Sequence, residues 1–600
     1  MALNLFAIPP CAPFLEALAE GWLHARGDDP LEIANGLILT PTRRAARALA
    51  EAFLRVSPAR SLLLPRIVAL GALDEAPLAL AGALELPPSV DPHRRLSVLA
   101  HLILRLNGAG GAPRTADRAW MLARELATLM DEADRAEIDL AARLPDAADP
   151  AYAAHWARTL EFLRIVTHAW PAWLEENGVI NPAARQVLLL NAQAKAWEER
   201  APDYPVVVAG TTAGIPAVAR LARVVVRLPL GCVVLPVLDT VMSNEAWAAM
   251  EDSHPQAGLA NLLAVLDATR DDVLLWGAGT LAAGNGPGKA RPEPTAGCAA
   301  TDPRVKPGDD AGQAPDDAGR APDDVVRTPG GGGARSDRFA LLSRALLPAP
   351  ALSAWQEPFV AVPDGLWRLS PRDAQEEAEA IAMILREAVE TQGRTAALVT
   401  PDRDLAGRVS AALPRHGIIA DDSAGETLSE TPPAVFLRLL ARAMTDNLAP
   451  VPLLALLKHP LAAAGLTPAA CRRGARALEL AALRGPRPES GLAGLRRAIA
   501  TSGEALNAFL SRVEACLEPA LRVQASVVIA PADAIAVLLA AAENLSATDE
   551  TPGAVRLWSE EEGEALSTLL TAALAALPNL PDQKGNVIPA LLDALLQGEV

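Results

Sequence analysis

The sequence is poor in cysteine, which argues against a disulfide framework or a structural metal site. Only five cysteines occur in 600 residues, namely Cys11, Cys232, Cys298, Cys471 and Cys516. None belongs to a CxxC pair, and the gaps between them exceed the usual spacing of zinc ligands. We therefore expect unpaired thiols in a reducing compartment and no bound metal in this chain.

Long apolar runs and a basic leader are also missing. No stretch reaches the roughly 18 uncharged apolar residues that a membrane-spanning helix needs. Residues 1–21 lack the basic start of a signal peptide. These features predict a soluble, cytoplasmic protein without membrane contact.

An excess of basic residues is absent as well, since the formal net charge is −18. A free-standing nucleic-acid-binding protein usually carries a basic balance. Net charge says little about local fields, however, so a basic strip or a basic partner still permits contact with DNA.

The sequence lacks an intact phosphate-binding loop. Such a loop reads GxxxxGK[ST], because backbone N–H groups, a lysine and a hydroxyl together hold phosphates and Mg²⁺. After the first apolar segment, residues 9–14 read PPCAPF, without glycine, lysine or hydroxyl, and the prolines remove backbone donors. The stretch 284–290, GNGPGKA, resembles the end of such a loop, but Ala290 follows the lysine. We expect no nucleotide binding at either place.

A carboxylate that would position Mg²⁺ and water is missing too. The apolar run at 204–210 is followed by threonines instead of Asp or Glu. The histidines do not form HExxH, and no GxSxG motif occurs. The chain therefore lacks the motifs of an ATPase, a zinc hydrolase or a serine hydrolase.

What is present is a repeated alternation of apolar runs and amphipathic helices, which predicts an α/β fold with parallel strands. Strands are expected at 3–8, 36–40, 204–210, 231–239, 271–277, 366–369 and 395–400, and helices at 12–25, 41–56, 215–228, 373–390 and 401–417. The first α/β domain comprises 1–75 and 196–280, and a second begins at 337–440.

Two further parts of the chain have a different character. Residues 76–195 and 441–600 carry apolar side chains at helical spacing, which predicts all-helical insertions. Residues 281–336 are rich in Gly, Pro, Asp and Ala and contain a seven-residue repeat, beginning GDDAGQA at 308. Such a composition buries too little apolar surface to fold, so we expect a disordered linker.

A threonine and two arginines stand where the second strand meets its helix. The segment LTPTRRAAR spans 39–47, and Thr42, Arg43 and Arg44 could hold backbone phosphates through hydroxyl and N–H donors at a helix N-terminus. A solvated helix face is the alternative. The same alternative is favoured for the basic patch of Arg472, Arg473 and Arg476.

An acidic pair, Asp421 and Asp422, offers a metal site or a turn, and the neighbouring Ser and Gly favour the turn.

Several long stretches, in preserved order, resemble the AddB family of double-strand-break repair proteins, in the form typical of alphaproteobacteria. They are FAIPPCAPFLEALAEG, LILTPTRRAARALAEAFL, AGTTAGIPAVARLA, GCVVLPVLD, HPQAGL, TAALVTPDRDLAGRV, DDSAGETLSETPPAVFLRLL and PLLALLKHPLA. The resemblance covers most of 3–275 and 337–465 and is looser over 466–600.

The resemblance implies a superfamily 1 helicase-like fold, with RecA-type domains, a degenerate phosphate loop and large helical insertions. It implies a partner, AddA, with which the family unwinds and degrades double-stranded DNA ends to leave a 3′ single strand. Thr42, Arg43 and Arg44 fall at a DNA-contacting motif. Thr211 and Thr212 fall in the degenerate carboxylate region and are weaker candidates for the same contact.

The chain departs from the family pattern in two ways. The linker 281–336 has no counterpart, and the nuclease motifs and iron–sulfur cysteines of the family's C-terminal region do not occur before Val600. Any iron–sulfur cluster or Mg²⁺ is therefore expected only in that region. The alternative to a DNA-scanning subunit is a truncated or remnant member of the family that is non-functional or serves only as a protein-interaction scaffold. A fragment, a frameshifted gene product and a split subunit all stay open as the origin of the chain. An active helicase is the third hypothesis, which the degenerate motifs disfavour.

Overall fold

The computed structural model divides into two compact units. The first comprises Met1–Leu86 and Gln186–Ala420, and the second comprises Pro87–Arg185 and Asp421–Val600. The structure describes residues 3–10, 12–27, 29–57, 61–72, 86–105, 115–146, 159–160, 162–277, 334–357, 366–425, 427–524 and 528–598.

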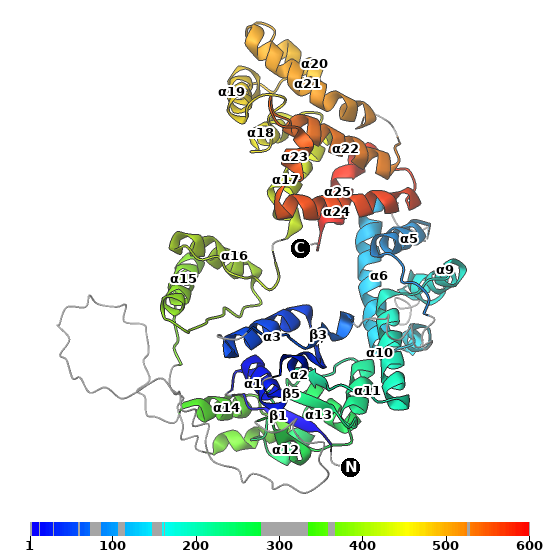
Figure 1. The fold of residues 1–600 in the computed structure, drawn as a ribbon. Helices are drawn as coiled ribbons and strands as arrows, with labels where there is room; N and C mark the ends of the chain where they lie inside the picture. Colours follow the sequence, from blue (N-terminus) through cyan, green and yellow to red (C-terminus); the bar gives the residue numbers. More distant parts are fainter. Residues whose placement is uncertain are drawn as a thin grey trace, which may run out of the picture. The chain divides into compact units, whose positions relative to one another are not determined.

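A six-stranded parallel sheet forms the centre of the first unit (Figure 1). Its strands are β1 (Leu5–Ile8), β2 (Leu37–Thr40), β3 (Arg66–Ala69), β4 (Val206–Ala209), β5 (Gly231–Pro236) and β6 (Leu274–Leu275). They lie in the order β3-β2-β4-β5-β1-β6. The predicted α/β class is confirmed. The apolar runs predict β1, β2, β4, β5 and β6, whereas β3, an edge strand that starts with an exposed arginine, was not predicted.

Alternate residues of each strand face two separate helical layers, as the period of a strand requires. On one face, Phe6 and Ile8 share a core with α1 (Phe14–Arg26) and α3 (Arg43–Val56). On the other face, Leu5 and Ala7 share a core with α10 (Pro182–Glu199), α11 (Pro216–Val225) and α13 (Ala257–Val265). A sheet buried on both faces explains why its strands read as unbroken apolar runs.

The helix after β2 begins later than the sequence suggested. We expected Pro41 inside its first turn, but α3 starts at Arg43 and Thr42 is its N-cap. The Thr42 hydroxyl accepts a hydrogen bond from the N–H of Ala45 at 3.0 Å, which satisfies one of the donors left open at a helix start.

The expected strands at 366–369 and 395–400 are not formed. Neither segment has regular secondary structure or strand pairing, and between 366 and 425 the described residues form helices but no strand. The helices are α15 (Ala374–Glu390) and α16 (Arg403–Ala412), which share a small core. A strand needs a neighbour for its hydrogen bonds, and an apolar run alone does not provide one.

Residues 334–336, which we assigned to the end of the linker, already belong to α14 (Ala334–Ala345). A 3-10 segment, η6 (Ala349–Gln356), follows this helix. The rest of the predicted linker lies outside the described residues.

The second unit is helical and draws on two distant parts of the chain. One part supplies α5 (Pro92–Arg105), α6 (Ala116–Ala136), α7 (Leu140–Arg143) and α9 (Trp170–Asn177). The other supplies α17 (Pro432–Thr445), α18 (Pro450–Lys458), α19 (Pro468–Leu478), α20 (Gly491–Ala498), α21 (Glu504–Gln524), α22 (Pro531–Ser546), α23 (Gly553–Leu557), α24 (Glu560–Ala576) and α25 (Ile588–Leu596). Both parts contribute to one continuous apolar core.

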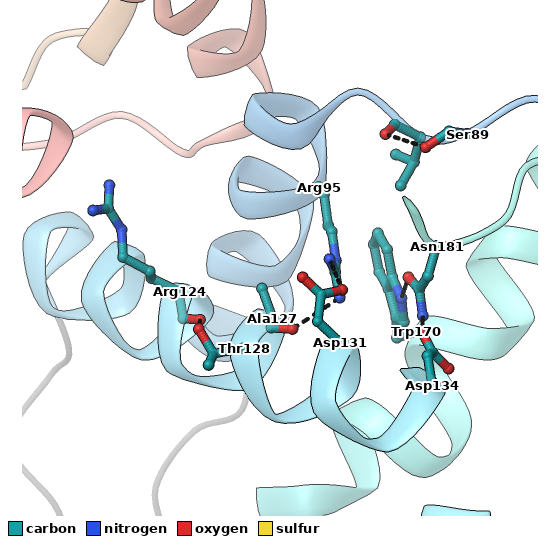
Figure 2. A network of polar contacts seen from close by, with 10 residues as sticks. Ser89, Arg95, Arg124, Ala127, Thr128, Asp131, Asp134, Trp170 and Asn181 are labelled. Carbon is teal, nitrogen blue, oxygen red and sulfur yellow. Dashed lines mark hydrogen bonds and ion pairs between the residues drawn. The ribbon is translucent and has the colours of Figure 1, made fainter. Parts of the chain in front are cut away.

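Within this unit, a buried arginine fixes α5 to α6 (Figure 2). Arg95 is only 4% exposed. Its guanidinium forms a 2.7 Å ion pair with Asp131 and donates a 3.1 Å hydrogen bond to the carbonyl oxygen of Ala127. A buried charge without such partners would be costly, so the pair ties the two helices together.

A second chain of polar contacts leads from α9 back to α6. The indole N–H of Trp170 donates to the side-chain oxygen of Asn181 at 2.9 Å. The Asn181 amide donates to Oδ2 of Asp134, also at 2.9 Å (Figure 2). Asn181, which directly precedes α10, thereby links α9 to α6.

Candidate nucleic-acid interface

The candidate residues lie at the carboxyl ends of two neighbouring strands. β2 and β4 are adjacent and parallel, with Leu37 opposite Val206 and Leu39 opposite Val208. Their following loops therefore leave the sheet at the same edge, which is where open α/β sheets bind ligands.

A glycine lets these two loops approach. Gly210, directly after β4, has a φ of 75°, a conformation that favours glycine. A Cβ atom at this position would lie 3.3 Å from Cε1 of Phe14 and 3.8 Å from Cδ of Pro41. The loop after β4 thus packs against both the start of α1 and the turn after β2.

The turn after β2 is fixed by two threonines. Thr40 is buried, and its hydroxyl donates to the carbonyl oxygens of Thr42 and Val68, at 3.2 and 3.4 Å. Thr42 is exposed and caps α3. A hydroxyl that accepts one hydrogen bond can still donate its proton to a phosphate oxygen.

The first turn of α3 has a positive electrostatic character. It contains Arg43 and Arg44, both exposed, and no acidic residue. Arginine near a helix N-terminus adds to the positive end of the helix dipole, which is unfavourable for the helix alone. The same arrangement is favourable when an anion binds there, because N–H groups, dipole and guanidinium groups all attract it.

The two threonines after β4 differ in how they can act. Thr211 is 7% exposed, and its hydroxyl accepts from the N–H of Ala213 at 2.9 Å, so it stabilises the loop. Thr212 is exposed and lies beside the start of α13, where a Cβ at Gly258 would come within 3.2 Å of its own Cβ. Of the pair, Thr212 has the surface that a ligand could reach.

The loop between β1 and α1 is unsuited to holding phosphate. Pro9, Pro10 and Pro13 have no N–H, and the N–H of Ala12 donates back to the carbonyl of Pro9 at 3.0 Å. Pro13 is the N-cap of α1 and provides no side-chain cap. A ring, Phe14, faces the glycine after β4.

A buried carboxylate that we did not predict follows the central strand β5. Asp239 follows β5 and is 3% exposed. Its Oδ1 accepts from the N–H groups of Val241 and Met242, both at 2.8 Å. The strand-like run 231–239 ends on this residue, which is the signal that could have found it. Its bonds give it a structural role in the turn.

A pocket of about 500 Å³ adjoins this turn. It is lined by Pro10, Val237, Asp239, His254, Pro255, Gln256, Arg338, Phe339, Leu342, Ser343 and Leu346. The ring of His254 bonds through Nε2 to the carbonyl of Leu346 at 2.7 Å and accepts from the N–H of Gln256 at 3.1 Å. These bonds attach the end of α14 to the loop before α13.

The other candidate residues from the sequence lie on a solvated helix face or in a turn. Arg472, Arg473 and Arg476 lie on the exposed face of α19, whose opposite face enters the helical core. Asp422 accepts from the N–H of Ala424 at 2.9 Å and so stabilises a turn. The stretch 284–290 lies outside the described residues.

In the part of the chain that the structure describes, no group of three or more His, Cys, Asp or Glu is placed to hold a metal ion. No helix there is long and apolar enough to span a membrane. No family model and no curated protein matches this chain.

Proposed function

We propose that the chain is a DNA-binding subunit of an AddAB-type helicase–nuclease, which processes double-stranded DNA ends for recombinational repair. It would bind and scan DNA without hydrolysing ATP itself. The observation that carries the proposal is the basic N-terminus of α3, with Thr42, Arg43 and Arg44 at the carboxyl edge of the sheet.

A RecA-type sheet with a degenerate nucleotide site is the fold we infer for the first unit. Three features support this inference. All strands are parallel, helices cover both faces, and a helical insertion separates β3 from β4. The residues at the β1–α1 loop and after β4 lack the groups that would bind phosphate and Mg²⁺.

The contact would be made to the sugar–phosphate backbone and not to base edges. A phosphate at the start of α3 would accept hydrogen bonds from first-turn N–H groups and from the Thr42 hydroxyl. Arg43 and Arg44 would neutralise its charge. Contacts of this kind fix the path of a strand but carry no sequence information, so reading of any DNA sequence during scanning would need other residues.

Binding to a duplex with a 3′ single-stranded tail, measured across a salt series, tests this proposal. R43A/R44A should lower the affinity about tenfold and reduce the slope of log affinity against log salt by about 1 per lost contact. R66A is a matched control, because Arg66 is exposed at the opposite, amino end of neighbouring β3. Equal affinity losses in both variants, or binding that ignores salt, would refute the proposed interface.

The partner would be an AddA-like subunit that carries intact ATPase motifs. Co-purification of the chain with such a subunit, followed by the same titration, tests this part. We expect the complex to bind ends more tightly than the chain alone, whose net charge of −18 disfavours approach to DNA. Failure to recover an AddA-like partner would favour the scaffold or remnant alternative.

A further inference from the structure

The pocket beside β5 is lined by a carboxylate of which one oxygen has no hydrogen-bond donor. Asp239 lines this pocket of about 500 Å³ and is 3% exposed. Its Oδ1 accepts two backbone N–H groups, whereas its Oδ2 accepts no hydrogen bond from the residues that the structure describes. Buried polar atoms in native proteins nearly always have a partner. The free oxygen at the pocket wall therefore indicates a site for a ligand that donates a hydrogen bond.

The rest of the pocket wall is mainly apolar. Its apolar residues come from the ends of β1 and β5, from the loop before α13, and from α14 with the residue that follows it; they are Pro10, Val237, Pro255, Phe339, Leu342 and Leu346. The volume lies in the range of small-molecule sites, which combine apolar walls with a few fixed polar groups. The ligand should accordingly have an apolar body as well as a donor.

A glutamine fixes the turn that carries the carboxylate. The Oε1 atom of Gln256 accepts from the N–H of Asp239, and its Nε2 donates to the carbonyl oxygen of Val237, both at 3.0 Å. Val237 has a φ of 47°, which is strained for a β-branched residue. Strain of this kind persists only where surrounding contacts hold it, and it clusters at binding sites. The turn is thus held in one conformation at the pocket wall.

The arginines near this turn have other contacts. The guanidinium of Arg270 donates to the carbonyl oxygens of Asp239 and Met242, at 3.0 and 2.7 Å. It also stacks on the ring of Trp247, 4.6 Å from the centroid. Arg338 lines the pocket, but it is exposed and takes part in another interaction. Among the described residues, Asp239 therefore has no ion-pair partner, and a buried carboxylate in this state attracts a cation and repels phosphate.

We propose that this pocket binds a small organic cation, in which a primary amine or a guanidinium group is joined to an apolar or aromatic body. The cationic N–H group would donate to Oδ2 of Asp239 in a charge-assisted hydrogen bond. The apolar body would contact Phe339 and Leu342 of α14. The inference is independent of the proposed DNA contact, whose residues follow β2 and β4.

Titration of the full-length chain with 4-phenylbutylamine tests the inference, with 4-phenylbutan-1-ol as the uncharged control of the same apolar body. Calorimetry should give the amine a Kd of about 1 mM or tighter, and the alcohol should bind about tenfold more weakly. Saturating amine should also slow amide exchange at 339–346, because it would link α14 to the turn after β5. Exchange in α3, which does not line the pocket, should not change.

Two substitutions that remove the same charge separate a direct contact from a general electrostatic effect. D239N keeps a side-chain oxygen for the N–H groups of Val241 and Met242 but replaces Oδ2 by a donor. It should lower the amine affinity about tenfold or more. D252N is the matched control, because Asp252 is exposed in the same loop as His254 and does not line the pocket. It should bind the amine like the parent chain.

A second pair of variants keeps the test informative if D239N does not fold. Leu342 lines the pocket and is 58% exposed, so a charged side chain there should leave the melting temperature unchanged. L342K brings a competing cation to the pocket and should weaken amine binding, whereas L342E should bind the amine more tightly than L342K.

Four outcomes would overturn the inference. They are absence of amine binding at about 10 mM, equal affinity for the amine and the alcohol, equal effects of D239N and D252N, and equal affinity in L342K and L342E.

Discussion

Two carboxylates on α6, those of Asp131 and Asp134, lie in different electrostatic environments. Asp131 pairs with the buried guanidinium of Arg95. Asp134 has mainly an amide, Asn181, as its neighbour (Figure 2). Burial raises the pKa of Asp134 above its ordinary value, and the bond from Asn181 offsets this only in part. Arg95 thus compensates the charge of Asp131, whereas burial destabilises the charged form of Asp134.

Neutralising these two residues should therefore change stability in opposite directions. D131N leaves Arg95 with a buried charge, so we expect the free energy of unfolding at neutral pH to fall by about 2–3 kcal/mol. D134N keeps an oxygen for Asn181 and removes a partly desolvated charge, so it should be neutral or stabilising. Urea denaturation of both variants measures this, and equal losses would contradict it.

The raised pKa of Asp134 makes the stability of the chain depend on pH. Because the folded chain holds the Asp134 proton to a higher pH than the unfolded chain does, this residue lowers stability as the pH rises from about 4 through its raised pKa. D134N should thus gain stability relative to the parent chain over that window, and the difference should level off above it. Urea midpoints at several pH values measure the gain, which a constant difference would refute.

At the scale of an element, the N-cap of α3 allows helix stability and DNA binding to be tested separately, by different substitutions at Thr42. Thr42 caps α3 with its hydroxyl oxygen, and Asp402 caps α16 with a carboxylate oxygen. T42D should thus retain the helix cap, whereas T42A should cost about 1 kcal/mol. T42S should retain both the cap and the hydroxyl.

DNA affinity should follow a different order in these variants. T42D places a negative charge where we expect phosphate, so it should weaken binding more than T42A does, despite its greater stability. T42S should bind like the parent chain. The test combines thermal melting with the DNA titration, and affinities that simply follow stability would show that the hydroxyl does not contact DNA.

Elements differ in how well their sequence predicts them. Buried strands such as β4 and β5 are short apolar runs between turn residues, so they were predicted to within a few residues. The run at 395–400 is equally apolar, yet it forms no strand. The pattern of apolar side chains indicates which residues a segment could bury. Formation of a strand also depends on hydrogen bonds to a neighbouring strand, which lies elsewhere in the chain.

The candidate site was predictable in part for a related reason. Hydroxyl and basic residues after β2 stand out locally, so Thr42, Arg43 and Arg44 could be named from the sequence. The burial of Thr211 depends on a loop packed against Phe14 and Pro41, which are far away in sequence. The sequence could not reveal that contact.

At the scale of the molecule, two distant chain segments share one helical core. Leu99 lies in α5 and is fully buried in a cluster that includes residues of α24 and α25. Amphipathic faces do not specify their partners, so the sequence predicted helices at 76–195 and 441–600 without indicating that they pack together.

Truncation of one core residue should therefore affect helices of both segments. L99A should cost about 3 kcal/mol and speed amide exchange in α24 and α25, although they lie far along the chain. L480A, at a residue 62% exposed, is the control and should change little. Faster exchange confined to α5 and α6 would contradict a shared core.

The position of β5 between β4 and β1 has a consequence for synthesis on the ribosome. Leu5 of β1 pairs with Val233 of β5. The hydrogen bonds between these two strands can therefore form only after β5, one of the last strands of the sheet, has been synthesised. At about 5–20 residues per second, that delay is roughly 10–45 s. During this time the nascent chain must be kept from aggregating. The helices at 92–136 remain partly uncovered for longer, because most of their core partners lie beyond residue 421.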